Sequence, residues 1–161
     1  MQVSNQITIH ADYERIFELA ARVEDWGRLL PHYRYVRVLR RDGNRKWVRM
    51  SALRNFIPVT WTAIQTVYPG TMHEPGHITF HHTGGLVRGM DVQWRFSPRD
   101  DGSVVVTIAH HLHHPPLPVR LLGAKLMGAI VGRTFISYIA GKTLRRIKQL
   151  AEQAATPATQ K

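Results

Sequence analysis

The spacing of apolar residues along this chain changes once, and that change limits the folds the chain can adopt. Up to Leu112 the apolar residues come in short runs that alternate with polar ones, and turn signals such as Asp42-Gly43-Asn44 separate the runs. From Val119 to about Ala154 there is no proline, and apolar residues recur every three or four positions. The first pattern predicts antiparallel strands joined by hairpins, and the second predicts one long helix.

A shorter helix is expected near the start of the chain. Asp12 is a suitable N-cap, and from Tyr13 to about Val23 the apolar residues lie three and four positions apart. Pro31 then begins a new segment. The strands that we predict are Val3–Ile9, Tyr33–Leu39, Trp47–Phe56, Val59–Tyr68, His77–His82, Met90–Phe96 and Val104–Leu112.

A sheet with one apolar face needs a cover, and the long helix near the C-terminus is the only large element available. We therefore predict an α+β fold in which a curved antiparallel sheet of about seven strands wraps around that helix, with an internal ligand cavity between them. The predicted helix contains Gly123, Gly128, Gly132 and Gly141, each of which costs about 1 kcal/mol relative to alanine. Either these glycines leave room for a ligand, or they allow close packing on a strand or a kink.

The composition points to a single domain. A chain of 161 residues has the size of one ordinary domain, and we assign residues 1–155 to it and 156–161 to a flexible tail. The absence of cysteine excludes a disulfide framework, a thiolate metal site and a cysteine nucleophile. The first residues lack a basic segment followed by an apolar run, so we expect a cytoplasmic protein without a secretory signal.

The charge is strongly positive and unevenly distributed. Lys and Arg number 22 against 11 Asp and Glu, which gives a formal net charge of +11. From Arg34 to Arg54 the chain carries many arginines and only one acidic residue, Asp42. This segment is either a solvated strand face or a surface that binds an acidic protein, an anionic membrane or nucleic acid.

Several segments resemble one known family. The run from Glu24 to Tyr33, followed by Val36-Arg37-Val38-Leu39, resembles the junction between the first helix and the second strand of bacterial polyketide aromatase/cyclases. These belong to the START-like, helix-grip superfamily. Trp61, the strand around Trp94 and the segment Thr143–Lys148 fit the same pattern. The resemblance covers nearly the whole chain, and it is more specific for the superfamily than for one activity.

The resemblance implies a pocket that holds a poly-β-ketone chain delivered by an acidic acyl carrier protein, and that favours one aldol closure and dehydration. The pocket tryptophan and tyrosine of the family correspond to Trp26 and Tyr33. The proposed acid/base arginine of the family falls on Gln65, which hydrogen-bonds a carbonyl but supplies no cation. Arg49 or Arg54 on the neighbouring strand could take the place of that arginine.

We therefore expect catalytic roles for Gln65, Tyr33 and Arg49. The residues expected to bind the ligand are Trp26, Tyr33, Trp61, Gln65, Trp94, His110, Gly128 and Phe135. One inward-facing histidine from the His81-His82 pair or the run His110–His114 is expected to act as a general acid or base, because its pKa lies near 6.5. We expect no metal site and no cofactor.

Two other functions stay open. The superfamily also includes carriers of quinones and other lipids, and the residues fit a carrier of a hydrophobic or aromatic molecule that touches an anionic membrane about as well as a cyclase. Nucleic-acid binding through the segment from Arg34 to Arg54 is the weakest alternative, because no known motif is matched. Motifs for serine hydrolases, phosphate-binding loops and dinucleotide binding are absent.

Overall fold

The computed structural model describes residues 2–54, 56–85, 87–113 and 133–155. Its strands are β1 (Gln2–Ile9), β2 (Tyr33–Asp42), β3 (Arg45–Arg54), β4 (Ile57–Tyr68), β5 (His77–Gly85), β6 (Met90–Pro98) and β7 (Val104–Leu112). The helices are α1 (Tyr13–Ala21), the 3₁₀ turn η1 (Val23–Asp25), α2 (Trp26–Leu29) and α5 (Arg133–Ala155). The strands form one antiparallel sheet in the order β1-β7-β6-β5-β4-β3-β2.

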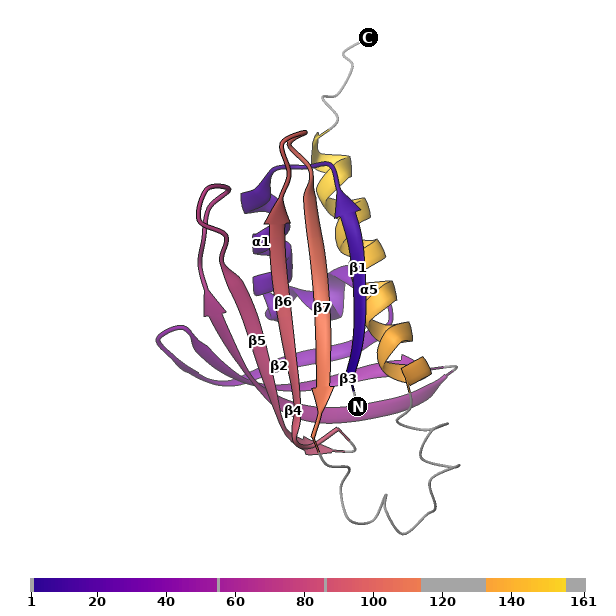
Figure 1. The fold of residues 1–161 in the computed structure, drawn as a ribbon. Coiled ribbons are helices and arrows are strands. Elements are labelled where there is room, and N and C mark those ends of the chain that lie inside the picture. Colours follow the sequence, from indigo (N-terminus) through magenta and orange to yellow (C-terminus); the bar gives the residue numbers. More distant parts are fainter. Residues whose placement is uncertain (1, 55, 86, 114–132, 156–161) are drawn as a thin grey trace.

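The sheet is strongly curved. In Figure 1, β1, β7 and β6 run along the length of the molecule, whereas β2, β3 and β4 sweep across its lower end. Helix α5 lies beside β1, and α1 lies behind β6. This arrangement confirms the predicted α+β fold, a curved antiparallel sheet of seven strands with a long C-terminal helix.

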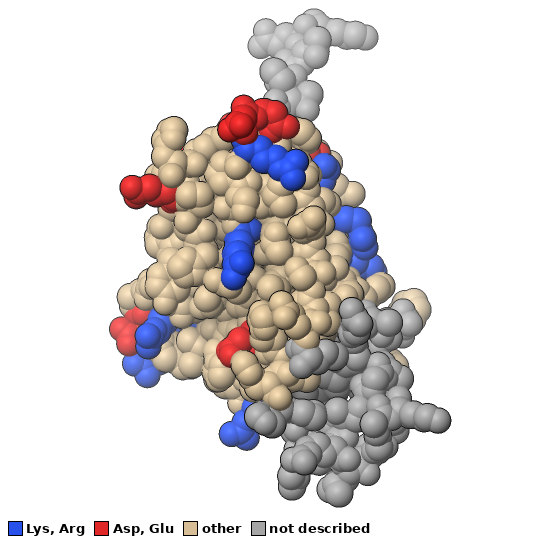
Figure 2. Space-filling model, in the orientation of Figure 1, with Lys and Arg blue, Asp and Glu red and all other residues tan. Residues whose placement is uncertain are grey.

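The alternation of side chains explains which face of the sheet is buried. In β7 every second residue is buried, including Val104, Val106, Ile108 and His110, because successive side chains of a strand point to opposite faces. The same alternation holds through β6. Figure 2 shows the other face of these strands, on which charged residues are few and scattered. The concave face therefore carries the core, and the convex face meets solvent.

Helix α1 ends earlier than the sequence predicts, at Ala21 rather than about Val23. The Ala21 carbonyl accepts hydrogen bonds from two side chains, Lys46 Nζ at 3.3 Å and Gln65 Nε2 at 3.1 Å. These donors take the place of the backbone N–H that would continue the helix. The chain then turns through η1, and α2 begins at Trp26.

Helix α5 is amphipathic. Its buried positions include Ile136, Ile139, Leu144 and Ile147. Gly141 faces β1, but a Cβ at this position would lie 3.8 Å from Asn5 Nδ2, an ordinary van der Waals distance, so the packing of the helix on this strand does not require a glycine there. The predicted start of the helix at Val119 and the predicted tail 156–161 lie outside the described residues, and the prediction of one domain over residues 1–155 stays a prediction. Among the described helices, none is long and apolar enough to cross a membrane.

Candidate functional site

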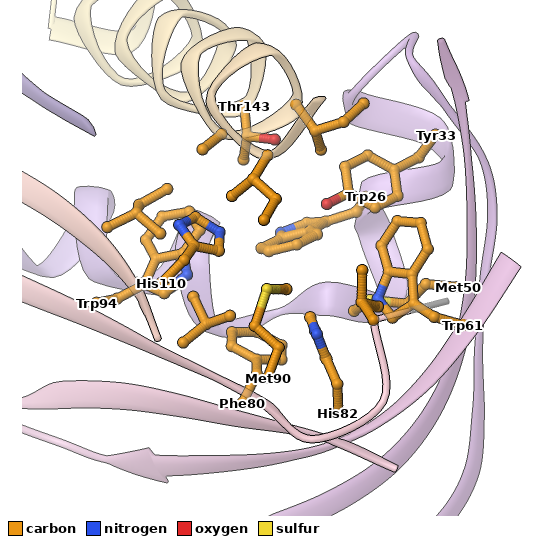
Figure 3. A pocket seen from close by; sticks show the side chains of 16 residues that line it. Trp26, Tyr33, Met50, Trp61, Phe80, His82, Met90, Trp94, His110 and Thr143 are labelled. Carbon is orange, nitrogen blue, oxygen red and sulfur yellow. The ribbon is translucent and has the colours of Figure 1, made fainter. Parts of the chain in front are cut away.

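A pocket lies between the concave face of the sheet and the buried face of α5. Strands β3 to β7 form its floor, and α2 and α5 form its walls (Figure 3). The lining is mostly apolar, with three polar members. The lining residues are Trp26, Tyr33, Met50, Trp61, Phe80, His82, Val87, Met90, Val92, Trp94, Ile108, His110, Ile136, Ile139, Ala140 and Thr143.

Trp26 occupies the centre of an aromatic cluster in this pocket. Its ring centroid lies 5.3 Å from that of Tyr33, 5.8 Å from that of Trp94 and 6.0 Å from that of Phe80. Its indole N–H donates to the Leu19 carbonyl at 3.0 Å, which ties the ring to α1. Because that donor is already used, Trp26 offers the pocket an apolar ring surface rather than a hydrogen bond.

The segment that carries Trp26 is fixed by an ion-pair cluster on the far side of η1. Glu24 accepts hydrogen bonds from Lys46 Nζ at 2.9 Å and from Arg41 Nη2 at 3.0 Å. Burial alone would raise the pKa of Glu24, but hydrogen bonds from its own backbone, Lys46 and Arg41 outweigh it and lower the pKa to about 2. The charged carboxylate therefore connects η1 to the β2–β3 hairpin at neutral pH.

Three buried nitrogen atoms on the pocket lining have no hydrogen-bond partner. They are Trp61 Nε1, His82 Nδ1 and His110 Nδ1. In Figure 3 the imidazole of His82 points from β5 into the space below Trp26. Unpaired polar atoms in a buried site cost free energy, so they mark a place where a polar ligand atom would be stabilised.

Both pocket histidines are neutral at physiological pH. Burial is the largest cause, and it lowers the pKa of His82 to about 3 with a further contribution from the neighbouring His110. Burial also lowers the pKa of His110 to about 4, although an interaction with the Val3 backbone raises this pKa. Nδ1 of His110 is the ring nitrogen without a partner, so it is the atom of this ring with which a polar ligand atom would pair.

Tyr33 belongs to a hydrogen-bonded chain that leaves the pocket through α5. Burial raises the pKa of Tyr33 far above its ordinary value, although a hydrogen bond with the Thr143 side chain opposes this rise. Tyr33 is therefore a hydrogen-bond donor and not a base. Thr143 Oγ1 in turn lies 2.9 Å from Nε2 of the buried His32. Burial, and then the positive charges of Lys142 and Arg145, lower the pKa of His32 to about 4.

The free space in this pocket is small, about 70 Å³. Sites for drug-sized ligands enclose about 300–1,000 Å³, so the pocket in this conformation holds only a small fragment. Large side chains fill the remainder, and two of them, Met50 and Met90, are unbranched and adaptable.

The structure separates the predicted site residues into three groups. Trp26, Tyr33, Trp61, Trp94 and His110 come together on the pocket lining, and their roles in binding stay predictions. Gly128 lies outside the described residues. Phe135 lies in α5, but its side chain is also outside the described part of the chain.

Gln65 and Arg49 do not line the pocket. Gln65 is fully buried on the concave face, but the sheet curves away there and its amide caps the end of α1. Arg49 is exposed between the buried Val48 and Met50, so its side chain lies on the convex face. A catalytic role for either inside this pocket would require a movement that brings it there.

Thr143 was not among the predicted site residues, and His82 was one candidate of the His81-His82 pair whose inward member was left open. His82 follows Ile78 and Phe80 at a spacing of two, and this alternation places all three on the same buried face of β5. Nothing in the local sequence indicates Thr143, because its partners lie more than a hundred residues earlier. Among the described residues, no cluster of three or more histidine, aspartate or glutamate side chains could hold a metal ion.

Comparisons with known proteins agree with this fold. Over 107 residues the chain is 31% identical to the actinorhodin polyketide synthase bifunctional cyclase/dehydratase of Streptomyces coelicolor, a match that covers 65% of this chain and 33% of that protein. This chain thus spans about a third of the length of the curated relative.

Two solved structures share the fold. The Zhui aromatase/cyclase from Streptomyces sp. R1128 superposes with a TM-score of 0.72 at 17% identity, over 99% of this chain and 98% of that one. A START superfamily protein from Mycobacterium smegmatis superposes with a TM-score of 0.66 at 18% identity, over 92% and 98%. These likenesses confirm the predicted START-like fold. The family model described as polyketide cyclase / dehydrase and lipid transport matches residues 9–133, and the chain belongs to that family.

Proposed function

We propose that this chain encloses a hydrophobic molecule bearing carbonyl groups in the pocket beneath α5, and that it cyclises and dehydrates a poly-β-ketone chain there. The observation that carries the proposal is the set of three unpaired nitrogen atoms, on Trp61, His82 and His110, in an otherwise apolar pocket. A β-diketone is complementary to this set, because its carbonyl oxygen accepts a hydrogen bond and its enol hydroxyl donates one. Each unpaired atom costs about 1–3 kcal/mol, and a ligand that pairs with it would remove that cost.

The two pocket histidines suit the first proton transfer. A neutral imidazole accepts a proton, and a CH₂ group between two carbonyls is acidic enough to give one up. In the proposed reaction Nδ1 of His110 takes this proton, while across the pocket the indole N–H of Trp61 donates to another carbonyl oxygen of the same ligand chain. The resulting carbon nucleophile attacks a carbonyl carbon farther along the chain and forms the new C–C bond. The alkoxide takes the proton back from His110, and elimination of water then leaves a C=C bond.

Ligand entry requires the pocket to enlarge. The present volume of about 70 Å³ is too small for a poly-β-ketone chain. Met50 and Met90 project into the pocket from the sheet and can change rotamer without moving the backbone. We expect the ligand to take the place of these two side chains and to leave the aromatic cluster around Trp26 intact.

Substrate delivery by an acidic acyl carrier protein is part of this proposal. On the convex face of β2 and β3, Arg37 and Arg49 lie opposite each other and are exposed. The ion pairs found in this hairpin involve Arg40, Arg41 and Lys46 instead. Two like charges across a strand pair repel each other, so an acidic partner would stabilise this surface.

A non-catalytic carrier of a quinone, lipid or aromatic molecule is the second candidate. It is favoured by the absence of charged side chains among the described pocket residues. An enolate is an anion, and stabilising it in a buried site without a cation is costly. A carrier needs only apolar contact and one or two hydrogen bonds, which Trp61 and Tyr33 would supply. In this role the basic surface would contact an anionic membrane.

One experiment separates the two candidates. The protein is incubated with a soluble poly-β-ketone analogue, binding is followed by tryptophan fluorescence, and mass spectrometry detects a product lighter by one water. We expect the wild-type protein to bind and convert the analogue, and His110→Gln to bind it without conversion. His111→Gln is the matched control, because His111 lies on the opposite face of β7.

The outcomes point in different directions. Conversion by wild type and His111→Gln but not by His110→Gln supports the cyclase. Binding without conversion by any of the three proteins supports the carrier. If none of them binds the analogue, both candidates are wrong for this class of ligand.

A further inference from the structure

A second hollow lies on the side of α5 that faces away from the pocket. It has a volume of about 620 Å³, and the loop before β2, the turn between β3 and β4, and the helix enclose it. The helix contributes Tyr138, Lys142, Arg145 and Gln149, which are three or four residues apart and share one face, and also Arg146 at the edge of that face. We call this hollow the outer groove. It is large enough for an organic ligand, whereas the inner pocket is not in this conformation.

The outer groove is positively charged, and its described lining residues include no counter-ion. Lys142, Arg145 and Arg146 line it, and no carboxylate is present among its described lining residues. None of the three takes part in an ion pair in the described part of the chain. The nearby Glu152 pairs with Lys148 instead. Neighbouring cations on one helix face repel each other, so a bound anion would relieve this repulsion.

Two of these cations are already oriented. Arg146 donates from Nε to the Leu29 carbonyl at 3.0 Å and from Nη1 to Gln149 at 3.3 Å. The Lys142 ammonium lies 4.4 Å from the centroid of the Tyr138 ring. Side chains that are held in place lose less entropy when they bind a ligand.

The opposite wall of the groove is apolar. Phe56 is 94% exposed and has a backbone φ of 68°, a conformation that bulky residues rarely adopt. Leu53 lies beside it on the same wall. An aromatic side chain held in solvent by an unfavourable backbone conformation is explained by a partner that covers it.

We propose that the outer groove binds a phosphate ester, with the phosphate among Lys142, Arg145 and Arg146 and the attached carbon chain against Phe56 and Leu53. The combination of clustered cations on one wall and apolar side chains on the other selects an anion joined to an apolar group. Two sources have this chemistry, a soluble phosphate monoester with an extended chain and the headgroup of an anionic phospholipid.

His32 provides a reporter for the groove. It lines the groove, its Nε2 lies 2.9 Å from Thr143 Oγ1, and Lys142 and Arg145 of α5 are the charged groups that act on it. A bound phosphate would neutralise these two cations and would change the environment of the imidazole. Binding is therefore visible at His32 by NMR without any assay of activity.

The first experiment titrates the protein with hexyl phosphate and follows the His32 resonances. We expect Lys142→Gln/Arg145→Gln to weaken binding about tenfold, as the loss of two exposed charge contacts predicts. Arg95→Gln/Arg99→Gln removes the same charge from two exposed positions at and after β6 and serves as the matched control, with binding unchanged. Phe56→Ser should weaken binding of hexyl phosphate and leave binding of inorganic phosphate unaltered. Equal weakening by the two double variants, or no change at His32, would overturn the proposal.

The second experiment distinguishes the two sources. The same proteins are sedimented with vesicles of equal parts phosphatidylcholine and phosphatidylglycerol. Vesicle binding that is lost in Lys142→Gln/Arg145→Gln and kept in Arg95→Gln/Arg99→Gln identifies a lipid headgroup. Binding of hexyl phosphate without such selective vesicle binding identifies a soluble phosphate ester. Neither experiment involves the inner pocket, so their failure leaves the proposed binding and cyclisation of a ligand in that pocket unaffected.

Discussion

Replacing His82 by glutamine should remove a large part of the acid sensitivity of the fold. The folded protein holds the pKa of His82 at about 3, whereas an unfolded chain has a histidine pKa near 6.5. Below about pH 6.5 the unfolded chain therefore binds a proton that the folded protein excludes. The stabilisation by the neutral, buried ring is fully present above that pH and is lost as the pH falls towards 3.

The magnitude follows from this difference in pKa. Each pH unit below the unfolded pKa lowers the free energy of unfolding by about 1.4 kcal/mol. At about pH 4.5, His82 alone therefore lowers the free energy of unfolding by about 2.7 kcal/mol. That is a substantial share of the roughly 5–15 kcal/mol that stabilises an ordinary domain. His110, His32 and Glu24, whose pKa values are also lowered, contribute as well, but they are present in both the wild type and the variant.

The assay is urea unfolding monitored by circular dichroism at about pH 7.5 and about pH 4.5. We expect the loss of stability between the two pH values to be about 2.7 kcal/mol smaller in His82→Gln than in the wild type. His73→Gln is the control, because His73 is exposed in the loop between β4 and β5. If His82→Gln and His73→Gln both keep the wild-type dependence on pH, His82 is not a neutral buried ring, and its proposed part in the pocket is wrong.

Substitutions at Gln65 and at two glycines test the roles that we assign to individual contacts. Gln65→Met removes the amide that donates to Ala21 and also removes the buried Oε1 atom that has no partner. The free energy of unfolding should therefore change by less than about 1 kcal/mol, and ligand affinity measured by fluorescence should stay the same. A loss of affinity in a folded variant would show that Gln65 contributes to ligand binding. Gly85 and Gly102 have nearly the same positive φ, 81° and 80°, but a Cβ at Gly85 would lie 2.6 Å from the Thr60 carbonyl oxygen, whereas at Gly102 it would meet nothing within 4 Å. Gly85→Ala should therefore cost more than about 2 kcal/mol and Gly102→Ala about 1 kcal/mol in the same unfolding assay, and equal costs would contradict the steric explanation.

The strands could be predicted because the direction of a side chain in a strand is a local property. Alternation in Met90–Phe96 identified the buried face of β6. For Val104–Leu112 the sequence left open which histidine faces inward, and the structure shows that His110 is on the buried face of β7. Arg49 shows where this reasoning fails. Trp47 and Val48 are both apolar and adjacent, so either could have been the inward residue, and the choice decides whether Arg49 faces in or out.

Gln65 shows a different limit. Alternation with Trp61 and Ala63 correctly indicates that it faces the concave side. The concave face is longer than the pocket, however, and where the strongly curved sheet meets α1 the inward residues serve that helix instead. The early end of α1 has the same origin, since its donors come from Lys46 and Gln65, 25 and 44 residues after Ala21. Contacts between residues so far apart in sequence leave no local pattern.

Helix α5 separates two environments of opposite character. Its inner face presents Ile136, Ile139 and Thr143 to a pocket without charged side chains, and its outer face presents Lys142 and Arg145 to solvent. Placing a cation in the pocket would incur a large desolvation penalty, which explains why both pocket histidines are held neutral. A pocket of this kind stabilises a free enolate only through hydrogen bonds from neutral donors. Proton removal and hydrogen bonding to the carbonyl oxygen must then occur together in any cyclisation, so His110→Gln and Trp61→Phe should each abolish most of the turnover, and the double variant should lose little more.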